Sequence, residues 1–359
     1  MSKPIQRRNQ RETNQVLLKQ AMLRRLPRRV SAQGEVTLPA VPSLLEHHVQ
    51  ALHTTFAQLG RVFSEEDTAR LRKILEKKLT DGFRASPYAK VVVKYQTDEP
   101  PSTLLSYNVS LKIMTIADEY DRWVNTRKPP LFGAHADSKL LALARSLGEP
   151  KDVPVLDVGA GTGRNALPLA RAGFPTDAIE LAPALAKILR EEIEKAGLSV
   201  RVFEGDALGG ELDVPENHYK VVVLAEVIAS HIRDVEQCRV LFDGAATALA
   251  PGGLLLFSAF LSSDGYKPDG LARELSQVFW CNLFTRADMA KAMEGLPLEL
   301  VSDESTFEFE KAHLGADAWP PTGWFEEWSN GLDLFDVPLG KAPMELRWLV
   351  YRKKSHVSA

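Results

Sequence analysis

The chain has 359 residues, of which 45% are apolar and 25% charged, a composition typical of a globular protein with room for two domains. Cys238 and Cys281 are its only cysteines and lack metal-type spacing, which excludes a disulfide framework and a cysteine-ligated metal, so we expect no metal. No apolar run has the ~18 residues of a membrane span, and the N-terminus lacks the apolar core of a signal peptide. We therefore expect a cytoplasmic protein without a membrane span.

The net charge of −3 is unevenly distributed. Residues 1–34 hold nine lysines and arginines against one glutamate, so they carry +8 and the remainder carries −11. We expect residues 1–40 to form a basic, flexible arm. Such an arm can bind nucleic acid or another anionic surface, and it can equally be a solvated tail.

Residues 41–130 are expected to form a small accessory module. Apolar residues at helical spacing predict helices over 45–59 and 64–82. Residues 90–95 are rich in strand-forming residues, and apolar and polar residues alternate over 105–111, which predicts a hairpin. The module is therefore of the α+β class, and none of its residues indicates a chemistry.

From about residue 135 strands alternate with helices. The expected helices span 140–147, 164–172 and 183–196. The expected strands span 154–158, 175–180, 200–204, 219–225, 253–260, 297–303 and 345–352. This alternation predicts a doubly wound, mostly parallel sheet over residues 131–355.

A glycine-rich turn follows the first of these strands, with the sequence D-V-G-A-G-T-G at 157–163. Glycines allow a ligand to approach the backbone closely, because no Cβ intervenes. Gly163 lies one place earlier than the third glycine of a dinucleotide motif. Asp157 would repel a pyrophosphate, but it suits a ligand that carries an ammonium and a sulfonium group. The turn therefore favours a cationic ligand over a dinucleotide.

Two further acids follow the next two strands. Glu180 ends the second strand, where a carboxylate can accept hydrogen bonds from both ribose hydroxyls. Asp206 follows the third strand and can bind an adenine amino group. The alternative for Asp206 is a turn residue whose side chain accepts a backbone N–H.

The order of these motifs resembles the class I S-adenosylmethionine-dependent methyltransferase family. The motifs are D-x-G-x-G-x-G, an acid after the second strand, G-D-A after the third, and A-P-G-G before the fifth. The resemblance covers about residues 135–260 well and does not reach residues 1–115. It implies a Rossmann-like, seven-stranded sheet that ends in an antiparallel hairpin, with S-adenosylmethionine as the cofactor.

The resemblance also implies roles for individual residues. The glycine turn with Asp157 would hold the methionine part of the cofactor, and Glu180 would hold the ribose. Ala225 and Glu226 would lie under the sulfonium, although Glu226 equally suits the first turn of a helix. The expected cofactor contacts are Asp157, Gly159, Ala160, Gly161, Gly163, Asn165, Glu180, Leu181, Asp206, Ala207, Ala225 and Glu226.

The run G-R-N-A-L at 163–167 resembles more specifically the tellurite-resistance and thiopurine-like branch of small-molecule methyltransferases. We therefore expect a methyltransferase enzyme that acts on a small or medium-sized acceptor. Two alternatives stay open. One is a protein or RNA methyltransferase that uses the N-terminal arm and module for recognition, and the other is a non-catalytic S-adenosylmethionine-binding protein.

A catalytic base is needed only if the acceptor carries a proton at neutral pH. His231 follows the fourth strand and Asp264 follows the fifth, so both are candidates, with a helix-surface histidine and a turn aspartate as the alternatives. An aromatic insertion over 313–340 contains Trp319, Trp324 and Trp328. These rings can form a lid over an apolar acceptor, or they can pack the insertion against the sheet.

Overall fold

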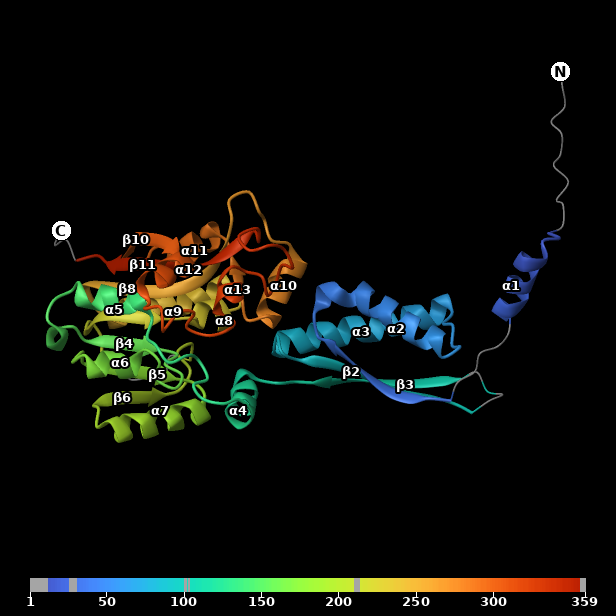
Figure 1. The fold of residues 1–359 in the computed structure, drawn as a ribbon, viewed down its shortest axis with the longest axis horizontal. Coiled ribbons are helices and arrows are strands. Elements are labelled where there is room, and N and C mark those ends of the chain that lie inside the picture. The colour runs from blue at the N-terminus through green and yellow to red at the C-terminus, as the bar shows by residue number, and fades with distance from the viewer. Residues whose placement is uncertain (1–11, 26–30, 100–101, 103, 210–213, 356–359) are drawn as a thin grey trace, which may run out of the picture. The chain divides into compact units, whose positions relative to one another are not determined.

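The computed structural model describes residues 12–25, 31–99, 102, 104–209 and 214–355. The chain divides into two compact units, labelled by element in Figure 1. Unit 1 comprises Met1–Arg84 and Ala89–Lys112, and unit 2 comprises Ala85–Tyr88 and Ile113–Ala359. The chain therefore leaves unit 1 and re-enters it before it finally continues into unit 2.

Unit 1 is a three-stranded antiparallel sheet with two long helices. The sheet order is β1-β2-β3, and its strands are β1 (Gln33–Pro39), β2 (Lys90–Thr97) and β3 (Leu105–Lys112). The helices are α2 (Leu45–Gln58) and α3 (Glu65–Ala85), preceded by α1 (Gln15–Arg25) and the short η1 (Pro42–Leu44). Leu52, Phe56, Leu71 and Leu75 are fully buried and pack against Val91 of the sheet. The two helices therefore cover one face of this small sheet.

The limits of the expected arm and module differ from those of the structure. Residues 33–39 were expected in the arm, yet they form β1 and pair with β2 from Gln33 opposite Gln96 to Pro39 opposite Lys90. The alternation of Val36 and Leu38 with polar neighbours explains this strand. Residues 116–126 were expected in the module but form a helix of unit 2. Residues 1–11 and 26–30 of the arm lie outside the described residues.

Unit 2 contains the large sheet, in the order β10-β11-β8-β7-β4-β5-β6, with β9 paired to β8. Strands β4 to β8 run parallel, and β11 is antiparallel to both β8 and β10. The strands are β4 (Val155–Val158), β5 (Thr176–Glu180), β6 (Val200–Glu204), β7 (Tyr219–Leu224), β8 (Leu249–Ser262), β9 (Leu283–Phe284), β10 (Leu298–Ser305) and β11 (Met344–Lys353). The predicted fold class is thereby confirmed.

Helices cover both faces of this sheet. Along β4, Val155 packs in one buried apolar cluster and Leu156 in another, because neighbouring strand residues point to opposite faces. One cluster includes residues of α9 and α11, and the other includes residues of α5 and α6. The helices of unit 2 are α4 (Ile116–Thr126), α5 (Ser138–Arg145), α6 (Ala166–Arg171), α7 (Pro183–Ala196), α8 (Val227–His231), α9 (Val235–Ala248), α10 (Gly270–Val278), α11 (Arg286–Met293), α12 (Thr306–His313) and α13 (Phe325–Ser329), with η2 (Pro150–Asp152) before β4.

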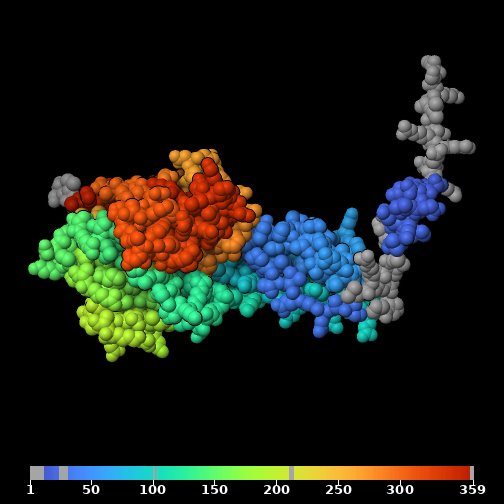
Figure 2. Space-filling view, viewed as in Figure 1, coloured from blue at the N-terminus to red at the C-terminus, as the bar shows by residue number. Residues whose placement is uncertain are grey.

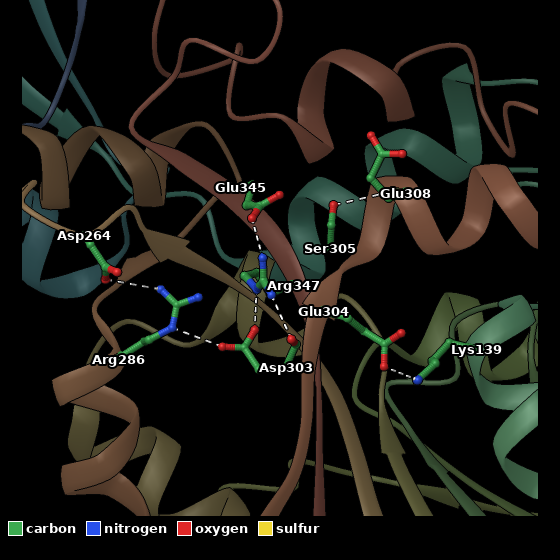
Figure 3. A network of polar contacts seen from close by, with 9 residues as sticks. All are labelled: Lys139, Asp264, Arg286, Asp303, Glu304, Ser305, Glu308, Glu345 and Arg347. Carbon is green, nitrogen blue, oxygen red and sulfur yellow. Dashed lines mark hydrogen bonds and ion pairs between the residues drawn. The ribbon is translucent and has the colours of Figure 1, made fainter.

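Charged side chains join the antiparallel edge of the sheet (Figure 3). Arg347 of β11 pairs with Asp303 of β10 and with Glu345 of its own strand. Arg286 of α11 also reaches Asp303, with Nε 3.0 Å from the carboxylate. These residues belong to the C-terminal segment, orange to red in Figure 2, which forms much of the viewed surface of unit 2. The network fixes the final hairpin against α11.

Gly163 gives a test of how tightly the turn after β4 is packed. Its φ is +94°, and an added Cβ would lie 2.7 Å from both Leu167 Cγ and Leu189 Cδ1. Gly197 at the end of α7 also has positive φ, +61°, but a Cβ there would meet no atom within 4 Å. Both Gly→Ala substitutions impose a backbone cost of about 1–2 kcal/mol, and only the first adds a steric clash. We predict that Gly163→Ala lowers the free energy of unfolding by ~1–3 kcal/mol more than Gly197→Ala, measured by chemical denaturation. Equal losses would show that the turn tolerates a side chain.

Candidate cofactor and acceptor site

The candidate site lies where the parallel strands β4, β5, β6 and β7 end, because their carboxyl ends meet at one edge of the sheet. The glycine turn leaves β4 with φ of +75° at Gly159 and +58° at Gly161. Glu180, at the end of β5, accepts hydrogen bonds from the N–H of Gly161 at 2.7 Å and from that of Ala182 at 2.8 Å. Its carboxylate therefore joins the glycine turn to the segment that follows β5.

The residues after β6 lie next to Glu180. The N–H of Gly205 donates to the main-chain oxygen of Glu180 at 3.0 Å. Asp206 is exposed, and its Oδ1 accepts the N–H of Leu208 at 2.9 Å, the turn geometry that the sequence left open as an alternative. Leu181 is 43% exposed, and Ala207 is half-buried. The expected ribose and adenine contacts thus lie on adjacent strand ends.

Arg164 connects three segments around the glycine turn. Its guanidinium binds Asp137, just before α5, and Glu226, just after β7, and its side chain is 10% exposed. Asn165 donates from Nδ2 to the Asp137 carboxylate at 2.8 Å and accepts the Asp137 N–H at 2.9 Å. These two hydrogen bonds position Asp137. Ala160, within the glycine turn, is buried. Glu226, with φ of +61°, precedes α8 and follows Ala225.

Negative charge dominates this edge. Asp157 is 2% exposed, and its Oδ2 has no hydrogen-bond partner among the described residues. Burial raises the pKa of Asp157 to about 7, against the opposing effect of Arg164. Burial likewise raises the pKa of Glu180 and of Glu226. A cationic ligand would reduce the repulsion between these carboxyl groups. A positively charged ligand is also what Asp157 predicts from the sequence.

A cluster of rings lies beside the glycine turn. We call it the ring cluster, and its members are Tyr88, Tyr120, Trp123, Phe132, His231 and Trp280. Trp280 stacks on Tyr88 with ring centroids 4.5 Å apart and lies 5.1 Å from Trp123. The Phe132 ring would lie 3.3 Å from a Cβ placed on Gly161, so the cluster borders the glycine turn.

His231 belongs to this cluster. Its Nε2 lies 2.7 Å from the hydroxyl of Tyr120, which comes from α4. Its Nδ1 is buried and finds no partner in the described part of the chain. Burial lowers the pKa of His231 to about 4, so the ring is neutral at pH 7. Tyr120 has a pKa raised by burial first and then by the charges of Glu180 and Glu226.

Asp264, the other candidate base, lies apart from the ring cluster. Its side chain is fully exposed, and its Oδ1 is 3.9 Å from Arg286 in the edge network of Figure 3. The geometry around Asp264 matches the alternative of a turn aspartate. A side chain so exposed takes no part in the buried contacts around the glycine turn.

The three tryptophans of the insertion occupy different environments. Trp328 is 4% exposed, packs edge-on against Phe260 of β8, and donates from Nε1 to the main-chain oxygen of Trp280 at 3.0 Å. Trp319 packs between Phe307 and Phe325. Trp324 is 39% exposed and lies edge-on to Trp328. This arrangement agrees with the packing alternative for the insertion. Trp328 contacts the ring cluster through its hydrogen bond to Trp280.

Sequence reasoning missed Asp137 and most of the ring cluster. A signal for α4 existed, since Thr115 and Asp118 form a reciprocal capping box at its start. Nothing local marks Trp280, whose contacts arise from tertiary packing. Among the residues that the structure describes, no three His, Cys, Asp or Glu side chains gather as a metal site. No helix in the described ranges is both long and apolar enough to span a membrane.

Comparison with known proteins identifies a methyltransferase domain in this chain. The family model of a methyltransferase domain matches residues 131–303. The chain is 36% identical over 110 residues to ubiquinone biosynthesis O-methyltransferase from Methylocella silvestris, covering 30% of this chain and 40% of that protein. It is 38% identical over 92 residues to a ribosomal RNA small subunit methyltransferase A from Methanosarcina barkeri, covering 26% and 30%. The matches thus span less than half of these relatives.

Among solved structures, geranyl diphosphate C-methyltransferase from Streptomyces coelicolor aligns with a TM-score of 0.43 at 14% identity, over 60% of this chain and 79% of that chain. With the family match and the strand order of the sheet, residues 131–303 belong to the class I S-adenosylmethionine-dependent methyltransferase family. The cofactor of this family is S-adenosylmethionine. The predicted family and cofactor class are confirmed.

The raised pKa of Asp157 predicts a pH-dependent cost to folding. Its pKa rises from 3.8 to about 7, so the folded state is penalised once the unfolded chain has lost this proton. The cost grows as the pH rises from about 4 to about 7 and is constant above that range. We predict that Asp157→Asn raises the free energy of unfolding, and that the gain is roughly 2 kcal/mol greater at pH 8 than at pH 5.

The measurement is urea denaturation of both proteins at the two pH values, without added ligand. Asp243→Asn on the exposed face of α9 is the matched control and should show no difference between them. A gain for Asp157→Asn that is the same at pH 5 and pH 8 would contradict the prediction.

Proposed function

We propose that this protein is an S-adenosylmethionine-dependent methyltransferase that methylates a small or medium-sized molecule. The observation that carries the proposal is the hydrogen bond from the Gly161 N–H to Glu180, with the unpaired carboxylate oxygen of Asp157 beside it. The two carboxylates offer acceptors for an ammonium group and for ribose hydroxyls. The buried Oδ2 of Asp157, which has no partner among the described residues, fits a ligand that supplies a donor.

Different segments of the chain would then bind different parts of the cofactor. The glycine turn admits the methionine part, Glu180 takes the ribose, and the segment at Asp206 and Ala207 receives the adenine. When bound, the cofactor supplies a methyl group that is already activated as a sulfonium. The protein therefore needs chiefly to position an acceptor in line with that group and to exclude water. Arg164 holds Glu226 and Asp137 in place beside the glycine turn.

Calorimetry tests the cofactor. We predict that S-adenosylmethionine and S-adenosylhomocysteine bind and that NAD does not, because Asp157 and the early Gly163 oppose a pyrophosphate. Glu180→Gln should weaken binding about tenfold or more, since it removes a charged acceptor of hydroxyl protons. The exposed Glu299→Gln on β10 is the control and should bind like the unchanged protein. Binding of NAD in place of S-adenosylmethionine would overturn the assignment.

Two features support a small molecule as the acceptor. The G-R-N-A-L run resembles small-molecule methyltransferases, and one relative is named as a ubiquinone biosynthesis O-methyltransferase. The chain outside residues 1–34 carries −11, which would repel a phosphate backbone. The competing function, methylation of RNA or protein guided by the basic arm, has a relative named as a ribosomal RNA methyltransferase in its favour.

Deletion of the arm separates these functions. Removal of residues 1–30 keeps Ala32, whose N–H donates to Thr97 at 2.7 Å, and therefore spares β1. We predict that the shortened protein and the full chain transfer radiolabelled methyl groups equally, to small molecules of a cell extract. Glu180→Gln serves as the blank. Label that appears only in RNA or protein, and only with residues 1–30 present, would favour the competing function.

A further inference from the structure

The ring cluster contains two buried polar atoms whose hydrogen-bonding capacity is not used by the described residues. Trp123 Nε1 and His231 Nδ1 have no hydrogen-bond partner within the described ranges. A buried polar group without a partner costs about 1–3 kcal/mol, so a ligand that pairs with both atoms would gain that free energy on binding. Both atoms lie among aromatic rings. A ligand that satisfies this environment presents a flat apolar face together with oxygen atoms.

The cluster also lies next to the carboxylates that we assign to the cofactor. Phe132 borders Gly161, and Tyr120 lies 5.9 Å from Phe132 between ring centroids. The charges of Glu180 and Glu226 act on the Tyr120 hydroxyl. The cluster therefore borders the turn and the carboxylates that we assign to the cofactor.

The backbone near the cluster is held in unusual conformations. Trp280 has φ of +59° and Glu226 has φ of +61°, both in the left-handed region that residues other than glycine seldom adopt. Each is stabilised by neighbours: the Trp280 main-chain oxygen accepts from Trp328, and the Glu226 N–H donates to Ser258 Oγ at 2.8 Å. Strain of this kind persists where surrounding structure enforces it, often at functional sites. It fixes the indole of Trp280 between Tyr88 and Trp123.

Tyr120 and His231 form a hydrogen-bonded pair inside this ring cluster, with 2.7 Å between the hydroxyl and Nε2. The neutral imidazole has a lone pair free to take a proton. The tyrosine hydroxyl can accept one hydrogen bond while it donates another. The pair is therefore arranged to pass a proton from a bound hydroxyl group to the imidazole.

We propose that the acceptor is a phenolic compound held by the ring cluster, and that Tyr120 and His231 remove the proton from its hydroxyl group. This inference rests on the proposed methyltransferase function. The O–H bond of the phenol breaks and its proton goes to Tyr120, whose own proton passes to His231 Nε2. The acceptor oxygen gains the methyl group that the sulfur of the cofactor loses. The positive charge that leaves the sulfur thus reappears on the imidazolium.

The test uses 4-nitrocatechol, a phenol whose visible absorbance reports whether it is ionised. Calorimetry first establishes binding of S-adenosylhomocysteine, and failure of that step overturns the proposed function itself. 4-Nitrocatechol is then added to the complex at a pH about one unit below its own pKa. We expect a larger phenolate fraction of the bound probe in the unchanged protein than in Tyr120→Phe and His231→Asn, which lack the hydrogen-bonded pair.

Tyr266→Phe is the matched control, because Tyr266 is a half-buried tyrosine packed on Phe335 outside the ring cluster. It should retain the probe spectrum of the unchanged protein. With S-adenosylmethionine as donor, kcat for the probe should fall ~10²-fold or more in Tyr120→Phe and His231→Asn, while affinity for S-adenosylhomocysteine changes less than threefold. Tyr120→Phe removes a single oxygen, so we expect this variant to fold. It tests the pair even if His231→Asn does not fold.

Two outcomes overturn the inference while the proposed function stands. One is a complex with S-adenosylhomocysteine that binds no 4-nitrocatechol. The other is a probe spectrum that is identical in the unchanged protein and in Tyr120→Phe.

Discussion

The buried guanidinium of Arg164 is the interaction on which the edge of the large sheet depends. A charge withdrawn from water must be paired, and Arg164 finds its partners in Asp137 and Glu226, which come from the start of α5 and the end of β7. Two segments distant in sequence are thereby held against the glycine turn. Without the guanidinium, two carboxylates would face each other beside Asp157. With the guanidinium present, carboxyl groups still outnumber positive charges at this edge. A cationic ligand is therefore favoured there.

Much of the large sheet could be predicted because its signals are local. Each buried strand is a short apolar run between turn residues, and Val155 and Leu156 show how neighbouring residues supply both apolar clusters. The glycine turn is equally local, since Gly163 must lie within contact of Leu167 a few residues later. These features depend on backbone conformation and on immediate neighbours. The sequence expresses both directly.

What could not be predicted depends on contacts between distant segments. β1 is a brief alternation that ends at Pro39, and its partner β2 lies beyond two helices. Trp280 follows α10, while the Trp123 ring that it meets comes from α4, and no periodicity links them. The His231 position was identifiable, but its hydrogen bond to Tyr120 was not. The proposal for this candidate base therefore rests on a partner that only the structure shows.

The passage of Ala85–Tyr88 through unit 2 makes that unit discontinuous in sequence. Ser86 donates to the main-chain oxygen of Met114 at 2.5 Å, and Tyr88 stacks on Trp280. A shortened protein that begins at Ile113 would keep every strand of the large sheet and the whole glycine turn, yet it would lack one wall of the ring cluster. With the roles proposed above, such a protein would keep its fold and its affinity for the cofactor but would lose affinity for the acceptor.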